Sequence, residues 1–310
     1  MAVNLKGRDY ISIHDFTVEE FRELLDMAHY LKRLRLAGAD FRPLAGKALA
    51  MIFHKPSTRT RISFEVGMMQ LGGQALYLSA GELQLRRGET IGDTAQVLSR
   101  YVDGILIRTF AHQDVTDLAK YASVPVINGL TDLLHPTQAL ADVMTIEEKM
   151  GGLKGVKLAY IGDGNNVAHS LMFASAKCGI KMALACPEGY DPLPEIVRQA
   201  REDAVETGAS IELYRDPFEA VAGADVVYTD VWASMGQETE HAKRAEALKQ
   251  YQVNRKLMSA ANRGAIFMHC LPAHRGEEVT DEVMDSKQSA VFDEAENRLH
   301  AHKAIMALLL

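Results

Sequence analysis

The chain has 310 residues, of which 47% are hydrophobic and 24% charged, so it is long enough for two globular domains with real cores. Its formal net charge of −7 argues against general binding to nucleic acids or anionic membranes, yet permits a local basic site for a small anion. No apolar run approaches the roughly 20 residues that span a bilayer, and the N-terminus lacks a signal-peptide core. With three cysteines that lack zinc-type spacing, these features predict a cytoplasmic protein with reduced thiols.

The first half of the chain alternates between predicted strands and helices. A capping box, Thr17-Val18-Glu19-Glu20, opens a helix that Gly38 ends. The apolar run 48–53 is typical of a buried parallel strand. An amphipathic helix follows Pro56 and ends at Gly72-Gly73. The remaining predictions here are strands at 74–79, 104–107 and 124–127, a turn at Asn128-Gly129, and a helix from His135 to Met150.

The glycine-rich segment 151–155 interrupts this alternation and is the predicted domain boundary. The pattern then restarts, with predicted strands at 156–161, 181–185, 211–214, 225–229 and 265–268, and helices at 166–177, 193–207, 240–251 and from 297 onward. Two rounds of alternation predict an α/β fold with two doubly wound domains, each a central parallel sheet flanked by helices. Ligands of such folds bind beyond the carboxyl ends of the strands.

Polar residues between the first strand and its helix form a candidate anion site. Ser57, Thr58 and Thr60 lie at the predicted helix N-terminus, where unpaired N–H groups and the positive end of the helix dipole favour a phosphate. Arg59 adds a guanidinium that can hold a phosphate through two parallel hydrogen bonds. The alternative interpretation is an ordinary N-cap next to a solvated arginine.

Two further candidates follow the next strands. Arg108 is either a surface arginine or a second guanidinium on the anion. His135 stands directly before a helix start, which predicts a neutral imidazole able to donate a hydrogen bond to a carbonyl oxygen, although a lone histidine is more often structural. His300 and His302, on the C-terminal helix, are predicted to be solvent-exposed.

The second half carries three polar segments after strands. In Gly162-Asp163-Gly164, a dinucleotide loop would need a third glycine where Val167 stands, so nucleotide binding is disfavoured. Asn166 is suited to binding an ammonium or a carboxylate. Asp230 follows a strand and could belong to a plain strand-end turn, and Cys270 could be a buried thiol or, with a neighbouring histidine, a metal ligand.

Two runs, Ser57-Thr58-Arg59-Thr60-Arg61-Ile62-Ser63-Phe64-Glu65 and His135-Pro136-Thr137-Gln138, resemble the carbamoyl-phosphate signature of the aspartate/ornithine carbamoyltransferase family. Two others, Asp230-Val231-Trp232-Ala233-Ser234-Met235-Gly236 and His269-Cys270-Leu271-Pro272-Ala273, resemble the segments by which the ornithine branch of that family binds its amino acid. The motifs stand in the family's order, and the resemblance covers essentially the whole chain.

The resemblance implies transfer of a carbamoyl group from carbamoyl phosphate to the side-chain amine of L-ornithine, in arginine biosynthesis or catabolism. It implies a carbamoyl-phosphate-binding domain at 1–150, joined by a C-terminal helix at 297–310, and an ornithine-binding domain at 151–296. Carbamoyl phosphate would be bound by Ser57, Thr58, Arg59, Thr60, Gln84, Arg108, His135, Gln138, Cys270, Leu271 and Arg298. Ornithine would be bound by Asn166, Asp230, Ser234 and Met235, and the catalytic roles would fall to Arg108, His135, Asp230 and Cys270.

The family also implies a homotrimer or a multiple of trimers, in which Gln84 reaches the phosphate site of a neighbouring subunit. No metal or nucleotide cofactor is expected, and neither a nucleic acid nor a membrane is an expected partner. A carbamoyltransferase for putrescine or N-acetylornithine is the nearest alternative, against which Asp230 and the Ser-Met-Gly loop argue. A nucleotide-binding dehydrogenase-like protein and a non-catalytic family member are the other two.

Overall fold

The computed structural model describes residues 3–79, 88–233 and 238–310. The backbone divides into two compact units, one formed by Met1–Leu140 with Arg298–Leu310 and the other by Ala141–Asn297. Both divisions fall inside long helices, α5 (Pro136–Met150) and α12 (Val291–Leu309). Each unit is an α/β layer structure around its own sheet, which confirms the predicted fold class.

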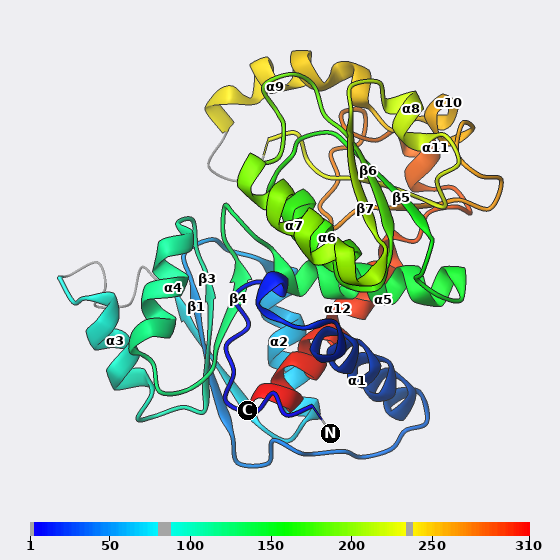
Figure 1. The fold of residues 1–310 in the computed structure, drawn as a ribbon. Coiled ribbons are helices and arrows are strands. Elements are labelled where there is room, and N and C mark those ends of the chain that lie inside the picture. The colour runs from blue at the N-terminus through cyan, green and yellow to red at the C-terminus, as the bar shows by residue number, and fades with distance from the viewer. Residues whose placement is uncertain (1–2, 80–87, 234–237) are drawn as a thin grey trace. The chain divides into compact units, whose positions relative to one another are not determined.

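The first unit is built on a four-stranded parallel sheet in the order β2-β1-β3-β4. Figure 1 shows α3 and α4 on one face of this sheet and α1, α2 and α12 on the other. The capping box at Thr17 is present, with Glu20 as its partner. The elements of this unit are α1 (Val18–Leu36), β1 (Ala48–Phe53), α2 (Thr58–Gln70), β2 (Gln74–Ser79), α3 (Ile91–Leu98), β3 (Gly104–Arg108), α4 (His112–Tyr121) and β4 (Val126–Leu130), besides its parts of α5 and α12.

The predicted turn at Asn128-Gly129 is wrong, because both residues lie inside β4. Tertiary pairing overrides the local turn preference here. Asn128 pairs with Ile107 of β3, and its side-chain Nδ2 donates to the carbonyl of Ile11 over 3.0 Å. A side chain at position 129 would approach Leu106 Cδ1 to 3.1 Å, so the glycine serves close packing between two strands.

The second unit is built on a five-stranded parallel sheet in the order β7-β6-β5-β8-β9. Helices α6 and α7 cover one face, and α8, α10 and α11 pack on the other around a buried apolar cluster that includes Val221, Leu257 and Phe267 (Figure 1). The short helices α8, α10 and α11 were not predicted from the sequence. The elements of this unit are β5 (Lys157–Ile161), α6 (Asn166–Cys178), β6 (Lys181–Ala185), α7 (Pro194–Thr207), β7 (Ser210–Tyr214), α8 (Pro217–Val221), β8 (Val226–Thr229), α9 (His241–Leu248), α10 (Arg255–Met258), β9 (Ile266–Met268) and α11 (Asp281–Met284).

Among the helices of the described residues, none combines the length and the apolar character that crossing a bilayer requires.

Candidate functional site

In the first unit, the predicted anion-binding residues lie at the carboxyl ends of three adjacent strands, β1, β3 and β4. Ser57 is the N-cap of α2, and its side chain accepts a hydrogen bond from the backbone N–H of Thr60 over 3.3 Å. Thr58 is exposed and Arg59 half-buried, whereas Thr60 is fully buried. The exposed start of α2 therefore has the N–H groups and the guanidinium that an anion requires.

A residue from the far end of the chain reaches this turn. The Nη2 of Arg298, on α12, donates to Thr60 Oγ1 over 2.7 Å, and both residues are buried. The two positions are 238 residues apart in the sequence. Local pattern could not have paired them, although the resemblance had assigned both to the same ligand.

His135 lies just before α5 and is almost fully buried, as is Arg108 at the end of β3. Burial, followed by the positive charges of Arg298 and Arg108, lowers the pKa of His135 well below its ordinary value. The imidazole is therefore neutral near pH 7, as predicted. The predicted reason, the helix N-terminus, is replaced by burial and the arginines. Gln138, also buried, donates its backbone N–H to the carbonyl of His135.

The prediction that His300 and His302 are solvent-exposed is wrong, because both are buried where α12 packs in the first unit. His302 stacks on Phe64 of α2 at a centroid distance of 4.1 Å, and its Nδ1 lies 2.8 Å from Ser63 Oγ. Burial and the charge of Arg298 lower the pKa of His302, and burial lowers that of His300 to about 3. Helix α12 is buried on both sides of this pair. Its sequence mixes apolar and polar residues, so the pattern does not indicate this burial.

Lys55 is a buried cation beside this turn that the sequence analysis missed. It forms an ion pair with Asp132 and lies over the ring of Phe110 at 4.2 Å from the centroid. The feature that could have identified Lys55 from the sequence is its position between the strand 48–53 and the helix after Pro56. The ion pair joins the loop after β1 to the loop after β4.

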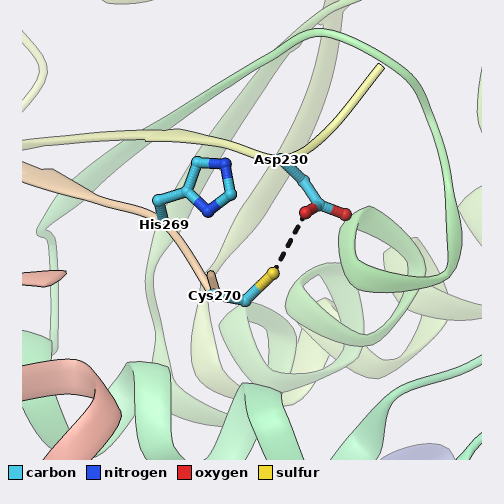
Figure 2. Close-up of side chains that lie close together, drawn as sticks. All are labelled: Asp230, His269 and Cys270. Atoms are coloured by element: carbon cyan, nitrogen blue, oxygen red, sulfur yellow. Dashed lines mark hydrogen bonds between the residues drawn. The ribbon is translucent and has the colours of Figure 1, made fainter. Parts of the chain in front are cut away.

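In the second unit, three side chains converge at the carboxyl ends of the adjacent strands β5, β8 and β9. The thiol of Cys270 donates to Asp230 Oδ1 over 3.0 Å, as Figure 2 shows. The other oxygen of Asp230 accepts a hydrogen bond from Asn165 Nδ2 over 2.7 Å. Asn165 is the N-cap of α6, and its Oδ1 accepts the N–H groups of Val167 and Ala168.

Cys270 is a neutral thiol in this arrangement. Burial raises its pKa well above the ordinary range, and the negative charge of Asp230 raises it further. The neighbour that orients Asp230 is Asn165, whereas the sequence analysis had singled out Asn166 alone. Asn166 is the first residue of α6 and is half-buried, one position away.

The segment after β9 is held by a buried histidine. The backbone N–H of Leu271, which has a φ of 58°, donates to His269 Nδ1 over 2.9 Å. Since Nδ1 is the acceptor, the proton sits on Nε2, which lies 3.1 Å from Glu278 Oε1. Both His269 and Glu278 are fully buried. The chain at Leu271 is thus fixed in a left-handed conformation that a residue with a side chain seldom adopts.

A second buried carboxyl supports the same segment. Glu294 Oε2, on α12, accepts the backbone N–H of His269 over 2.9 Å, and its Oε1 accepts the hydroxyl of Tyr228 over 3.1 Å. Burial, followed by the charge of Asp142, raises the pKa of Glu294 well above its ordinary value. All four residues are fully buried. Nothing in the local sequence marked Glu294 as part of a site.

Arg244 ties the start of the loop after Asp230 to the turn after β5. Its Nη1 lies 2.9 Å from Asp163 Oδ2 and donates to the carbonyl of Trp232 over 3.1 Å. Burial raises the pKa of Asp163 to about 6 against the opposing charge of Arg244. The sequence analysis missed Arg244, because a cation within a charged helical segment is typical of a solvated surface.

The structure also bears on two alternatives, metal binding at Cys270 and dinucleotide binding at the segment Gly162-Asp163-Gly164. Asp230, His269 and Cys270 bring possible metal-ligating atoms within 4.8 Å of one another. Both ring nitrogens of His269 and the thiol of Cys270 make hydrogen bonds within the protein. Hydrogen bonding therefore accounts for the closeness of these atoms. At Gly164, a side chain would come within 2.2 Å of the Pro192 nitrogen, so backbone packing alone accounts for that glycine.

Three predicted site residues, Gln84, Ser234 and Met235, lie outside the residues that the structure describes. The described candidates form two groups, one in each unit. The first is a set of cations and helix N–H groups at the ends of β1, β3 and β4. The second is a carboxylate, an amide and a neutral thiol at the ends of β5, β8 and β9.

Two family models together match most of the chain. Residues 8–148 match the carbamoyl-P binding domain of aspartate/ornithine carbamoyltransferase, and residues 154–309 match its Asp/Orn binding domain. The ornithine carbamoyltransferase of Thermococcus kodakarensis is 61% identical over 310 residues, covering 100% of this chain and 98% of that protein. That of Symbiobacterium thermophilum is 59% identical over 306 residues, covering 99% of each.

Solved structures show the same similarity. The ornithine carbamoyltransferase from Pyrococcus furiosus superposes with a TM-score of 0.97 at 59% identity, covering 99% of this chain and 98% of the other. The enzyme from Thermus thermophilus superposes with a TM-score of 0.87 at 42% identity, covering 97% of this chain and 99% of the other.

Proposed function

The chain belongs to the aspartate/ornithine carbamoyltransferase family, and from this premise we propose that it is a transferase with L-ornithine as its amine substrate. It moves the carbamoyl group of carbamoyl phosphate to the ornithine side-chain amine, giving L-citrulline and phosphate. The observation that carries the choice of ornithine is the pair Asp230 and Cys270, joined at 3.0 Å. Putrescine has no α-carboxylate, and an acylated α-amine could not form an ion pair with Asp230.

Carbamoyl phosphate binds, in this proposal, to the domain at 1–150 with the helix at 297–310. Its phosphate sits on the N-terminus of α2, held by Ser57, Thr58 and Arg59. The similarity to the family adds Gln84 of a neighbouring subunit at the phosphate, and Gln138, Leu271 and Arg298 at the carbamoyl group. The burial of Thr60 and Arg298, joined at 2.7 Å, supports a preorganised set of donors.

The reaction is a direct displacement at an activated acyl group, so it needs little covalent chemistry from the protein. The lone pair of the amine attacks the carbonyl carbon, and the negative charge that develops on the carbonyl oxygen is stabilised by Arg108, Thr60 and the neutral His135. The C–O bond to phosphate then breaks, and the proton that the attacking nitrogen loses passes to the departing phosphate, which leaves as the hydrogen phosphate dianion. No cofactor enters this scheme.

Ornithine binds in the domain at 151–296. Asp230 pairs with its α-ammonium, and Asn166, Ser234 and Met235 hold the α-carboxylate and cover the substrate. The side-chain ammonium must lose a proton before attack, because it has no lone pair and a pKa of roughly 10 in water. Burial among the cations that hold phosphate lowers that pKa. Cys270 acts as a hydrogen-bond partner of the amine.

The assembly, location and pathway are finer parts of the proposal. We infer a homotrimer or a multiple of trimers on the strength of the family, and sedimentation of an active monomer would contradict it. Cytoplasmic location is supported by three free cysteines, which a reducing compartment would preserve. The product, citrulline, places the reaction in arginine biosynthesis or arginine catabolism.

A side-by-side assay tests the proposal. Carbamoyl phosphate is offered with L-ornithine, putrescine, N-acetylornithine or L-aspartate, and the carbamoylated product is measured. We expect turnover with ornithine to exceed that with each other amine by at least a hundredfold in kcat/KM. A higher rate with any of the three others would overturn the assignment of ornithine, and the absence of any product would overturn carbamoyl transfer itself.

A further inference from the structure

A cluster of histidines and carboxylates lies in the second unit, on residues that the proposed reaction does not use for substrate binding. His241 begins α9, and its Nε2 lies 3.0 Å from Glu277 Oε2. His274 approaches the same oxygen with its Nδ1 at 3.8 Å. The possible ligand atoms of His274, Glu277 and Glu278 all lie within 4.8 Å of one another. Two segments far apart in sequence thus bring two imidazoles to one carboxylate.

One residue of this cluster has a buried oxygen without a hydrogen-bond partner among the described residues. Glu278 is fully buried, and its Oε1 accepts hydrogen bonds from the backbone of His274 and from His269. Its Oε2 has no hydrogen-bond partner among the described residues. A buried carboxylate oxygen without a partner costs free energy, and a bound cation would remove that cost.

The spacing of the ligand atoms suits a small, four-coordinate ion. With metal–ligand bonds of about 2.0–2.2 Å, neighbouring atoms of a tetrahedral shell are about 3.3–3.6 Å apart. The distances from Glu277 Oε2 to His241 Nε2 and to His274 Nδ1, 3.0 and 3.8 Å, bracket that range. Imidazole nitrogens together with carboxylate oxygens favour zinc and similar transition metals, whereas calcium and magnesium prefer oxygen ligands alone.

We propose that His274, Glu277 and Glu278, whose possible ligand atoms lie together, form a binding site for a divalent transition metal such as Zn²⁺, with His241, which contacts Glu277, as a fourth ligand. The half-exposed imidazoles give the ion access from solvent. A bound ion would link the start of α9 to the segment 274–278, which follows Cys270 closely in the chain. The inference does not depend on which amine the protein carbamoylates.

The test measures zinc binding by titration calorimetry on the metal-free full chain. Cys270→Ser is the background protein, because the thiol group beside Asp230 could bind zinc by itself. We expect one saturable site per chain, and His241→Gln and Glu277→Gln should each weaken it at least tenfold. His29→Gln, on α1 of the other unit, is the matched control and should bind zinc as the background does.

X-ray absorption on the zinc-loaded Cys270→Ser chain supplies a second readout. The expected shell contains nitrogen and oxygen ligands with the scattering signature of two imidazoles. Circular dichroism establishes that each variant is folded before it is compared. The absence of saturable binding, equal affinity in the His241 variant and the background, or a shell dominated by sulfur would each overturn the proposal.

Discussion

The carboxyl group of Glu294 accepts a hydrogen bond from the backbone N–H of His269 over 2.9 Å, with both residues fully buried. The acceptor lies on α12, and the donor stands directly before the candidate thiol Cys270. Glu294 also accepts the hydroxyl of Tyr228. A residue with no expected substrate contact therefore sets the path of the chain that presents the thiol.

Replacing Glu294 with glutamine should perturb ornithine use more than carbamoyl-phosphate binding. A glutamine offers one acceptor oxygen instead of two, so one of the two buried donors loses its partner. We expect a free energy of unfolding lower by about 1–3 kcal/mol and a kcat/KM for ornithine reduced by roughly tenfold, or about 1.4 kcal/mol. Glu296→Gln, an exposed position on the same helix, is the control. Equal kinetics in the two variants would show that Glu294 has no positioning role.

Arg298→Lys should weaken the carbamoyl side of the site. The guanidinium donates to Thr60 Oγ1 over 2.7 Å, and its charge contributes to the lowered pKa of His135. A lysine keeps the charge but cannot reproduce the planar set of donors. We expect a drop of at least tenfold in kcat, measured by citrulline formation at saturating ornithine. A kcat within twofold of the natural chain would contradict the proposed role of Arg298.

Arg59→Lys should raise the KM for carbamoyl phosphate by tenfold or more, because two parallel hydrogen bonds to phosphate need the guanidinium fork. The matched control is Arg61→Lys, two positions along the same helix. Arg61 pairs with Glu65 over 2.9 Å and stacks on Tyr77, so its role is structural. If both variants kept the natural KM, Arg59 could not be the phosphate ligand.

Cys270→Ser and Asp230→Asn should separate two roles. A serine can donate to Asp230 as the thiol does, so we expect Cys270→Ser to retain measurable turnover with a weaker affinity for ornithine. Asp230→Asn should reduce ornithine use far more than carbamoyl-phosphate binding, which equilibrium dialysis measures. Because its pKa is raised, Cys270 should react slowly with iodoacetamide at neutral pH. Isolation of a carbamoylated Cys270 would rule out direct attack by the amine.

The stability of the first unit should fall in acid. His135, His300 and His302 have pKa values below the ordinary 6.5 in the folded chain, that of His300 at about 3. The unfolded chain therefore binds protons first, so their contribution is present above pH 6.5 and is lost as pH falls toward the folded values. Urea unfolding at pH 7 and pH 5 measures this. His300→Gln should lose less stability over that interval than the natural chain, and an equal loss would contradict the assignment.

Much of the fold could be predicted because it depends on local pattern. The apolar run before His54 and the capping residues Ser57 and Thr17 determine strand and helix boundaries through nearest neighbours alone. Alternating strands and helices then dictate parallel sheets, and the carboxyl ends of those strands are where polar segments such as His135 and Cys270 had to lie. The family's motifs added roles that periodicity could not supply.

What the tertiary structure decided are the contacts that join distant parts of the chain. The sequence alone cannot show that Arg298 reaches Thr60, that Glu294 holds His269, or that Asn165 orients Asp230. The sequence analysis predicts an exposed His302 for the same reason, because local pattern does not show what packs against α12. Local pattern reports which residues share a face of one element. Burial and hydrogen-bond partners depend on what packs against that face. In this chain α12, at the C-terminal end, supplies Arg298 to the group of residues in the first unit and Glu294 to the group in the second.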